Sequence, residues 1–168
     1  WSSDVCSSDL MNVHAFRRHD AQGYAYASDG RAMLLENGAL ADPQAGPYRF
    51  SGMRHIQMPT TLPTLDELLG REVDGAELTT QNIAAHILGL TAENRRDHVY
   101  TLHAELEGQK LAPIFEQLLS GWKAQGYQLA SMADYYEKIK HAPLPEYPVQ
   151  WGELPGRSGE LIVLDTKT

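Results

Sequence analysis

Cysteine is almost absent from this 168-residue chain, because the single one, Cys6, lies within the first ten residues. That scarcity excludes internal disulfides and a zinc site built from thiolates. Apolar runs are also short, and none approaches the length of about 20 residues that a membrane-spanning helix needs. Positive charge is scarce: 14 Lys and Arg stand against 22 Asp and Glu, for a net charge of -8. Nucleic acid is therefore excluded as a partner, since phosphate backbones are bound by clustered Lys and Arg.

Several catalytic motifs are missing as well. None of the seven histidines forms an H-x-x-x-H pair, and the sequence contains no HExxH. It also lacks a glycine-rich phosphate loop and a nucleophile elbow. A self-contained zinc site, a nucleotide site and a serine hydrolase site are therefore not supported.

The first ten residues, WSSDVCSSDL, do not have the pattern of a targeting segment. They contain no Lys or Arg, and their longest apolar run is Val5-Cys6, whereas a secretory signal needs both features. Back-translated as TGG AGT TCA GAC GTG TGC TCT TCC GAT CT, they read as a common sequencing adapter. Leu10 fits, because CT with any third base encodes leucine. We interpret 1–10 as adapter-derived and 11–168 as the C-terminal part of a longer domain, free of cysteine and with a net charge of -6.

The rest of the chain alternates between helical and extended patterns. Helices are predicted over 11–22, from the Thr64-x-x-Glu67 capping box to Gly70, over 80–90, over 110–125, and from Ser131 to Ile139. Strands are predicted over 24–28, 54–58, 98–103 and 127–130, and the 161–164 run is expected to pair or pack. Residues 35–52 are rich in glycine, proline and asparagine and are expected to form a loop. Such alternation predicts an α/β protein with a parallel sheet.

Two polar side chains follow predicted strands. His103 ends the 98–103 strand and precedes Glu105 and Glu107. Active sites of parallel α/β folds lie at this end of the strands, and an imidazole beside a carboxylate can donate a proton near neutral pH. Asp29 follows the 24–28 strand in the same way. The alternatives are a capped strand end with solvated glutamates for His103 and a turn-forming aspartate for Asp29, and both stay open.

Four blocks, in order along the chain, carry a resemblance to a known family. They are GYAYASDGR at 23–31, IQMPTTLPTLDE at 56–67, VYTLHAELEG at 99–108 and PGRSG at 155–159. These blocks resemble those of the formamido-arabinose-phosphoundecaprenol deformylases, which are members of the NodB-type polysaccharide deacetylase superfamily. The HAE-x-EG and TLPT-x-DE blocks distinguish these deformylases from other deacetylases of the superfamily.

The resemblance implies a fold, a reaction and residue roles. It implies the C-terminal portion of a deformed (β/α) barrel whose N-terminal strands are missing, and hydrolysis of a formamide. His103 matches the general acid, and Asp29 matches, more weakly, the carboxylate that orients it. Arg31, Glu105 and Glu107 are implied as substrate-binding residues. In the family a divalent metal, expected to be zinc, is held by an aspartate and an H-x-x-x-H pair, and these ligands are missing from this chain.

The resemblance also implies a partner and a location. The substrate would be an undecaprenyl phosphate-linked 4-deoxy-4-formamido-L-arabinose, an intermediate of lipid A modification and of resistance to cationic antimicrobial peptides. The protein would lie peripherally on the cytoplasmic face of a bacterial inner membrane, or in the cytoplasm as a fragment. We expect the chain alone to be inactive, to bind no catalytic metal and, as a partial barrel with open strand edges, to be loosely packed or poorly soluble. Two alternatives remain: another sugar N-deacetylase, and a non-catalytic domain that binds a glycan or a protein partner.

Overall fold

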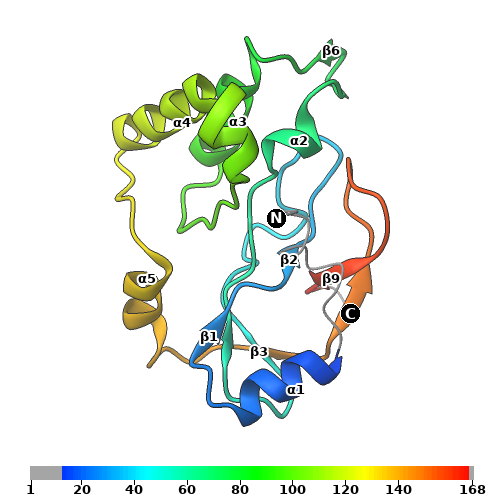
Figure 1. The fold of residues 1–168 in the computed structure, drawn as a ribbon, viewed down its shortest axis with the longest axis vertical. Helices are drawn as coiled ribbons and strands as arrows, with labels where there is room; N and C mark the ends of the chain where they lie inside the picture. The colour runs from blue at the N-terminus through cyan, green and yellow to red at the C-terminus, as the bar shows by residue number, and fades with distance from the viewer. Residues whose placement is uncertain (1–12, 167–168) are drawn as a thin grey trace.

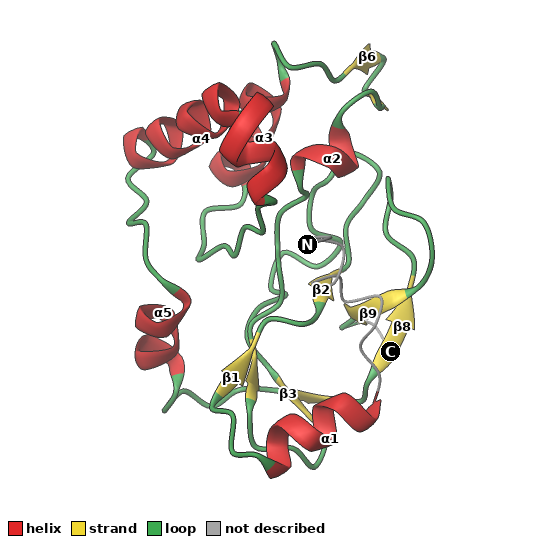
Figure 2. Ribbon diagram, in the orientation of Figure 1, coloured by secondary structure: helices red, strands yellow, loops and turns green. Residues whose placement is uncertain are grey.

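The computed structural model describes residues 13–166, so the predicted adapter segment lies outside the described residues. The molecule is elongated, with a group of helices at one end and short strands at the other (Figure 1). Helices α2, α3 and α4 lie together at the first end, whereas β1, β3 and α1 lie at the opposite end. Helix α5 lies along one side, between these two ends (Figure 2).

The helices follow the sequence pattern closely. They are α1 (Val13–Ala21), α2 (Leu65–Leu68), α3 (Ile83–Glu93), the π-helix η3 (Leu106–Lys110), α4 (Ala112–Ala124) and α5 (Met132–Ile139). Helix α5 begins at the predicted cap, where the Ser131 side chain accepts a hydrogen bond from the Asp134 backbone. Pro113 lies in the first turn of α4. Backbone N–H groups in the first turn have no acceptor within the helix, so the missing N–H of proline costs no helical hydrogen bond. The five predicted helices are confirmed, with shifted ends, over the residues that are described.

The strands are short and pair in small sheets. They are β1 (Tyr26–Ala27), β2 (Arg31–Ala32), β3 (Arg49–Phe50), β4 (Ile56–Gln57), β5 (Glu72–Val73), β6 (Ala76–Glu77), β7 (Glu146–Tyr147), β8 (Gln150–Gly152) and β9 (Leu161–Leu164). Pairs β1–β4, β2–β9 and β3–β7 are parallel, whereas β5–β6 and β8–β9 are antiparallel. Within residues 13–166 these strands form four separate sheets and not a closed barrel. The predicted α/β class is confirmed as a mixed α/β fold with small sheets, whereas the C-terminal portion of a deformed barrel stays a prediction.

Two predicted strands, 98–103 and 127–130, are extended segments without a ladder. At Val99 the carbonyl accepts from the Thr61 N–H at 3.0 Å, but the Val99 N–H donates to the Thr61 hydroxyl at 2.9 Å. A side chain therefore takes the place of the next backbone acceptor, and strand pairing stops there. Conversely, the predicted loop 35–52 contains β3, because Arg49 and Phe50 find a parallel partner in β7, far away in the sequence.

Three apolar clusters hold these elements together. The first joins α1 to β3 and β9, and in it the Phe16 and Phe50 rings lie 4.7 Å apart. The second packs α2, α3 and α4 around residues such as Leu65, Ile87 and Leu118. The third joins β4 to α5 through Ile56, Met58 and Ile139. Each cluster is built from segments that are distant in sequence, so apolar packing holds these segments together.

The C-terminal PGRSG block contacts α2 so closely that only glycine fits. Gly156 has a φ of +83°, and a Cβ atom there would lie 2.2 Å from the Glu67 carbonyl oxygen. We expect Gly156→Ala to lower the free energy of unfolding by about 2–4 kcal/mol, from the left-handed backbone and the clash together. Urea denaturation measures this change.

Gly159 provides the matched control, since it has the same φ of +83° but nothing within 4 Å of its Cβ position. Gly159→Ala should lower the free energy of unfolding by only about 1 kcal/mol, which is the cost of placing alanine in the left-handed backbone conformation. Equal losses in the two variants would contradict the close contact between Gly156 and α2.

Candidate active site

Three of the four sequence blocks meet at the buried carboxylate of Glu67. Arg31 donates two hydrogen bonds to it, from Nη1 at 2.6 Å and from Nη2 at 2.8 Å. Arg157, from the PGRSG block, places its Nη1 3.6 Å from the same carboxylate. Arg31 and Glu67 are only 5% and 2% exposed. Blocks that are distant in sequence are therefore joined through one bidentate ion pair.

Glu67 also belongs to the predicted capping box of α2, which the structure confirms. The Thr64 backbone N–H donates to Glu67 Oε2 at 3.0 Å. Burial raises the pKa of Glu67, but the hydrogen bond and charge of Arg31, together with Thr64 and Arg157, outweigh burial and hold the pKa below its ordinary value. Glu67 is thus ionised at neutral pH and forms an anchor at the start of α2.

The fourth block places His103 beside the same helix. His103 Nδ1 lies 3.4 Å from Asp66 Oδ1, and the two side chains are 31% and 45% exposed. The contact brings together the HAELEG block and the TLPTLDE block. A partly exposed imidazole next to a carboxylate is the arrangement of a proton donor or acceptor, because the ring is open to solvent and lies beside a charged partner.

Glu107 fixes the backbone at His103. Its Oε2 accepts a hydrogen bond from the His103 N–H at 2.8 Å, and its Oε1 accepts one from the Tyr100 hydroxyl at 3.1 Å. Burial, followed by the charge and hydrogen bond of Glu107, raises the pKa of Tyr100, so the phenol stays a donor. The Tyr100 ring stacks on Phe115 and meets the edge of Trp122. His103 is thereby tied to the core of α4.

Asp29 lies in different surroundings from those predicted. Its Oδ2 lies 3.6 Å from His19 Nδ1 and 3.4 Å from Gln57 Nε2. The carboxylate beside His103 is Asp66 instead, so the orienting role of Asp29 stays a prediction. Sequence reasoning missed Asp66, although the signal was present: it lies within the capping box, one residue before Glu67.

The predicted substrate-binding residues also differ in their surroundings. Arg31 and Glu107 are buried, and the two Nη atoms of Arg31 and both carboxylate oxygens of Glu107 are hydrogen-bonded within the protein. Glu105, in contrast, is exposed at the start of η3. A direct role in substrate binding remains a prediction for all three. Both side chains hold a segment of the site in place: Arg31 bonds to Glu67 at the start of α2, and Glu107 bonds to the His103 backbone.

The side chains present do not match the metal site implied by the resemblance. Between Val13 and Thr166, no group of three or more His, Cys, Asp or Glu side chains is placed to hold a metal ion. The described residues therefore do not fit the implied metal. In the same range, no helix is both long enough and apolar enough to cross a bilayer.

Removing the anchor charge should unfold the site. We expect Glu67→Gln to lower the free energy of unfolding by about 3–5 kcal/mol, because the buried Arg31 guanidinium is left without its counter-charge. The depressed pKa of Glu67 sets the pH dependence. Its contribution is complete above the ordinary value of 4.5 and is lost as the pH falls through the lower folded-state value. Thermal melts at several pH values would measure both effects.

Acidification should therefore destabilise the wild type more than Glu67→Gln, and the two should converge at the lowest pH. A control variant, Glu36→Gln, removes the carboxylate of an ion pair with Arg71, in which the Glu36 side chain is 88% exposed. It should change stability by about 0–1 kcal/mol. Parallel pH curves for wild type and Glu67→Gln would contradict the anchor role.

Comparison with known proteins supports the grouping of these blocks. No protein-family model matches the chain. It is 30% identical over 137 residues to a probable 4-deoxy-4-formamido-L-arabinose-phosphoundecaprenol deformylase, ArnD, of Wigglesworthia glossinidia brevipalpis, covering 81% of the chain and 43% of the relative. It is 36% identical over 107 residues to the protein of the same description from Shewanella sediminis (strain HAW-EB3), covering 62% of the chain and 32% of the relative. The chain is therefore a distant homologue of the ArnD deformylases over much of its own length, and it matches less than half the length of these relatives.

Proposed function

We propose that this chain supplies the proton-donating part of an amide hydrolase site that removes the formyl group from a lipid-linked formamido sugar. One observation carries the proposal: the four blocks that resemble the deformylases converge on α2, through Arg31, Arg157 and His103. The homology to deformylases over 81% of the chain supports the reaction class. The substrate class comes from the description of those relatives, an undecaprenyl phosphate-linked 4-deoxy-4-formamido-L-arabinose.

His103 is the proposed general acid. Water adds to the formyl carbon and loses one proton to solvent, and the carbon–nitrogen bond then breaks as the leaving nitrogen takes a proton from the His103 imidazolium. The formic acid released loses its proton to give formate. The two protons lost in these steps are taken up again by the His103 imidazole and by the free amine. Asp66, 3.4 Å from Nδ1, is the proposed positioning residue that leaves Nε2 free to face the substrate. Glu107 accepts the hydrogen bond of the His103 backbone N–H. In this proposal Asp66 therefore positions the ring of His103, and Glu107 positions its main chain.

The proposal extends to the setting of the reaction. A lipid-linked substrate places the whole protein at a membrane surface, on the cytoplasmic face of a bacterial inner membrane, within lipid A modification. Because residues 13–166 do not fit the metal of the family, we expect the chain alone to release no formate. The activity is therefore best tested with the matched stretch of this chain placed inside a longer relative.

A chimera provides that test. The matched 137-residue stretch of this chain would replace its counterpart in the Wigglesworthia glossinidia brevipalpis relative. Formate release from the undecaprenyl phosphate-linked formamido sugar would then be measured. We expect turnover by the chimera, and a loss in kcat of about 10²–10⁴-fold in His103→Ala, with KM changed much less. Asp66→Asn should lower kcat with KM changed much less, because it removes the carboxylate that lies 3.4 Å from His103 Nδ1 and is proposed to position the ring.

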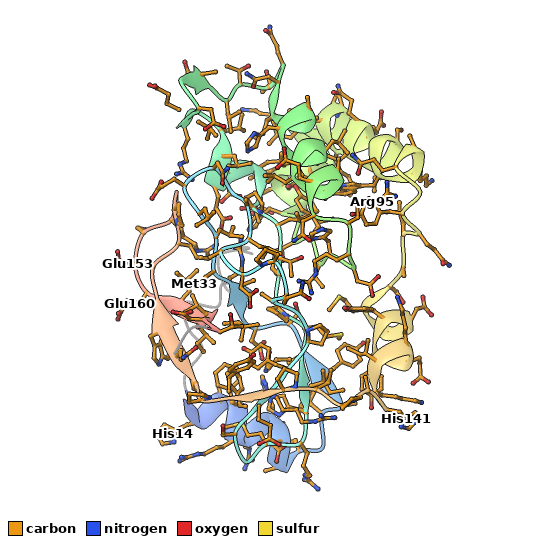
Figure 3. All side chains as sticks on the ribbon, turned by 180° about the vertical axis from the view of Figure 1, so that it is seen from behind. His14, Met33, Arg95, His141, Glu153 and Glu160 are labelled. Atoms are coloured by element: carbon orange, nitrogen blue, oxygen red, sulfur yellow. The ribbon has the colours of Figure 1, made fainter. Side chains whose placement is uncertain are left out.

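His141→Ala is the matched control, since this exposed histidine lies beyond the end of α5 (Figure 3). It should leave turnover unchanged. The proposal fails if His103→Ala retains the full kcat, or if the chimera releases acetate from an N-acetyl sugar in preference to formate. The second result would favour a sugar N-deacetylase.

A further inference from the structure

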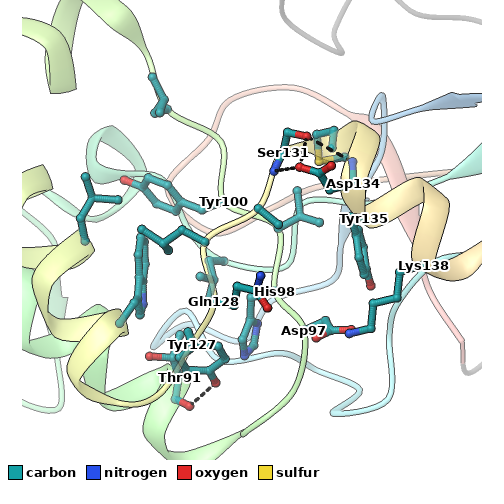
Figure 4. Close-up of a pocket in the computed structure, with 18 of the residues that line it drawn as sticks. Thr91, Asp97, His98, Tyr100, Tyr127, Gln128, Ser131, Asp134, Tyr135 and Lys138 are labelled. Carbon is teal, nitrogen blue, oxygen red and sulfur yellow. Dashed lines mark hydrogen bonds and ion pairs between the residues drawn. The ribbon is translucent and has the colours of Figure 1, made fainter.

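A cavity of about 600 Å³ lies next to the segment that leads into His103. Its walls come mainly from residues within 97–102, the side of α4, 126–132 and α5, and Leu62 and Thr91 complete the lining. Figure 4 shows Tyr100 on one side of this space, and Asp97 and Lys138 on the other. The volume is typical of sites that take small organic ligands, which span roughly 300–1,000 Å³.

Part of the cavity lining is apolar. Leucine, valine and aromatic side chains make up this part, namely Leu62, Val99, Tyr100, Leu102, Phe115 and Trp122. Leu102 and Leu129 are unusual for leucines, because they are 46% and 43% exposed, and both line this same cavity. Single exposed leucines need no explanation, but two at the rim of one apolar cavity indicate a surface built for an apolar ligand.

The charged groups of the cavity lining already have partners within the protein. Lys138 Nζ lies 2.8 Å from Asp97 Oδ2, and the Asp134 carboxylate accepts a hydrogen bond from the Ser131 hydroxyl at 2.7 Å. Burial lowers the pKa of His98, whose ring nitrogens contact the Thr61 hydroxyl and the Asn94 carbonyl. The lysine of the lining is thus paired with an aspartate, so the lining suits an uncharged hydrocarbon better than a free anion.

We propose that this cavity binds part of the isoprenoid chain of a polyprenyl phosphate. The inference rests on the proposed function, and it adds the place where the lipid portion of the substrate is held. Leu102 lies at the cavity, and the next residue is His103, so the cavity and the candidate site are continuous along the chain. An isoprenoid held against Leu102 and Tyr100 would bring its polar head group toward His103 and Asp66.

Direct binding to this chain tests the inference without any turnover. Farnesyl phosphate, below its micelle concentration, is the probe, and isothermal titration calorimetry measures its dissociation constant. We expect binding by the wild type, displacement by farnesol and no displacement by inorganic phosphate. Leu129→Asp and Leu102→Asp should each weaken binding about tenfold or more, because they place a carboxylate against the hydrocarbon.

Leu35→Asp is the matched control, since Leu35 is 50% exposed and lies outside this cavity. It should leave the dissociation constant unchanged. The inference is overturned if the wild type fails to bind farnesyl phosphate, if inorganic phosphate displaces the probe as well as farnesol does, or if Leu35→Asp weakens binding equally. Sedimentation that shows a dimer abolished by Leu129→Asp would assign the cavity to a second copy of the chain.

The outcomes separate this inference from the proposed function. Loss of farnesyl phosphate binding with continued formate release by the chimera would overturn the lipid cavity and leave the reaction standing. If the chain binds farnesyl phosphate but its chimera releases no formate, the proposed reaction is overturned and the lipid cavity stands.

Discussion

The ion pair between Arg31 and Glu67 is the interaction on which the rest of this structure depends. Two charges at 5% and 2% exposure are stable only when each satisfies the other, and here the guanidinium meets the carboxylate through two short hydrogen bonds. The same carboxylate caps α2 through Thr64 and lies 3.6 Å from Arg157. The strand β2, the start of α2 and the C-terminal PGRSG loop are thus joined through one buried carboxylate. The small sheets of this protein do not connect these three elements.

The candidate acid depends on that anchor indirectly. Asp66 precedes Glu67 in α2, so the position of the helix start also determines where a carboxylate meets His103. From the other side, Glu107 and Tyr100 connect the His103 backbone to the aromatic side chains of α4. The imidazole is therefore held between two helices and not at the end of a regular strand. This arrangement keeps the ring partly exposed while its backbone is fixed.

The helices and their caps could be predicted from the sequence, because their determinants are local. Leu118 and Trp122 recur at helical spacing in α4, and Ser131 with Asp134 marks the start of α5. Strands were predicted less well, since an extended segment forms a ladder only if a partner lies beside it. The Val99 N–H donates to the Thr61 side chain and not to a backbone carbonyl, so no ladder forms at Val99. Arg49 and Phe50 pair with β7 and form a strand within the segment that was predicted to be a loop.

The sequence by itself indicated the family, because the four blocks that resemble deformylases can be compared residue by residue, and the chain is 30% identical over 137 residues to a probable deformylase. It also determined the starts of α2 and α5, through side chains that bond to backbone groups three residues away. Only the tertiary structure decided which carboxylate accompanies His103, and that Arg31 is buried against Glu67. These facts depend on contacts between residues about 35 positions apart, and such contacts leave no periodic pattern in the chain.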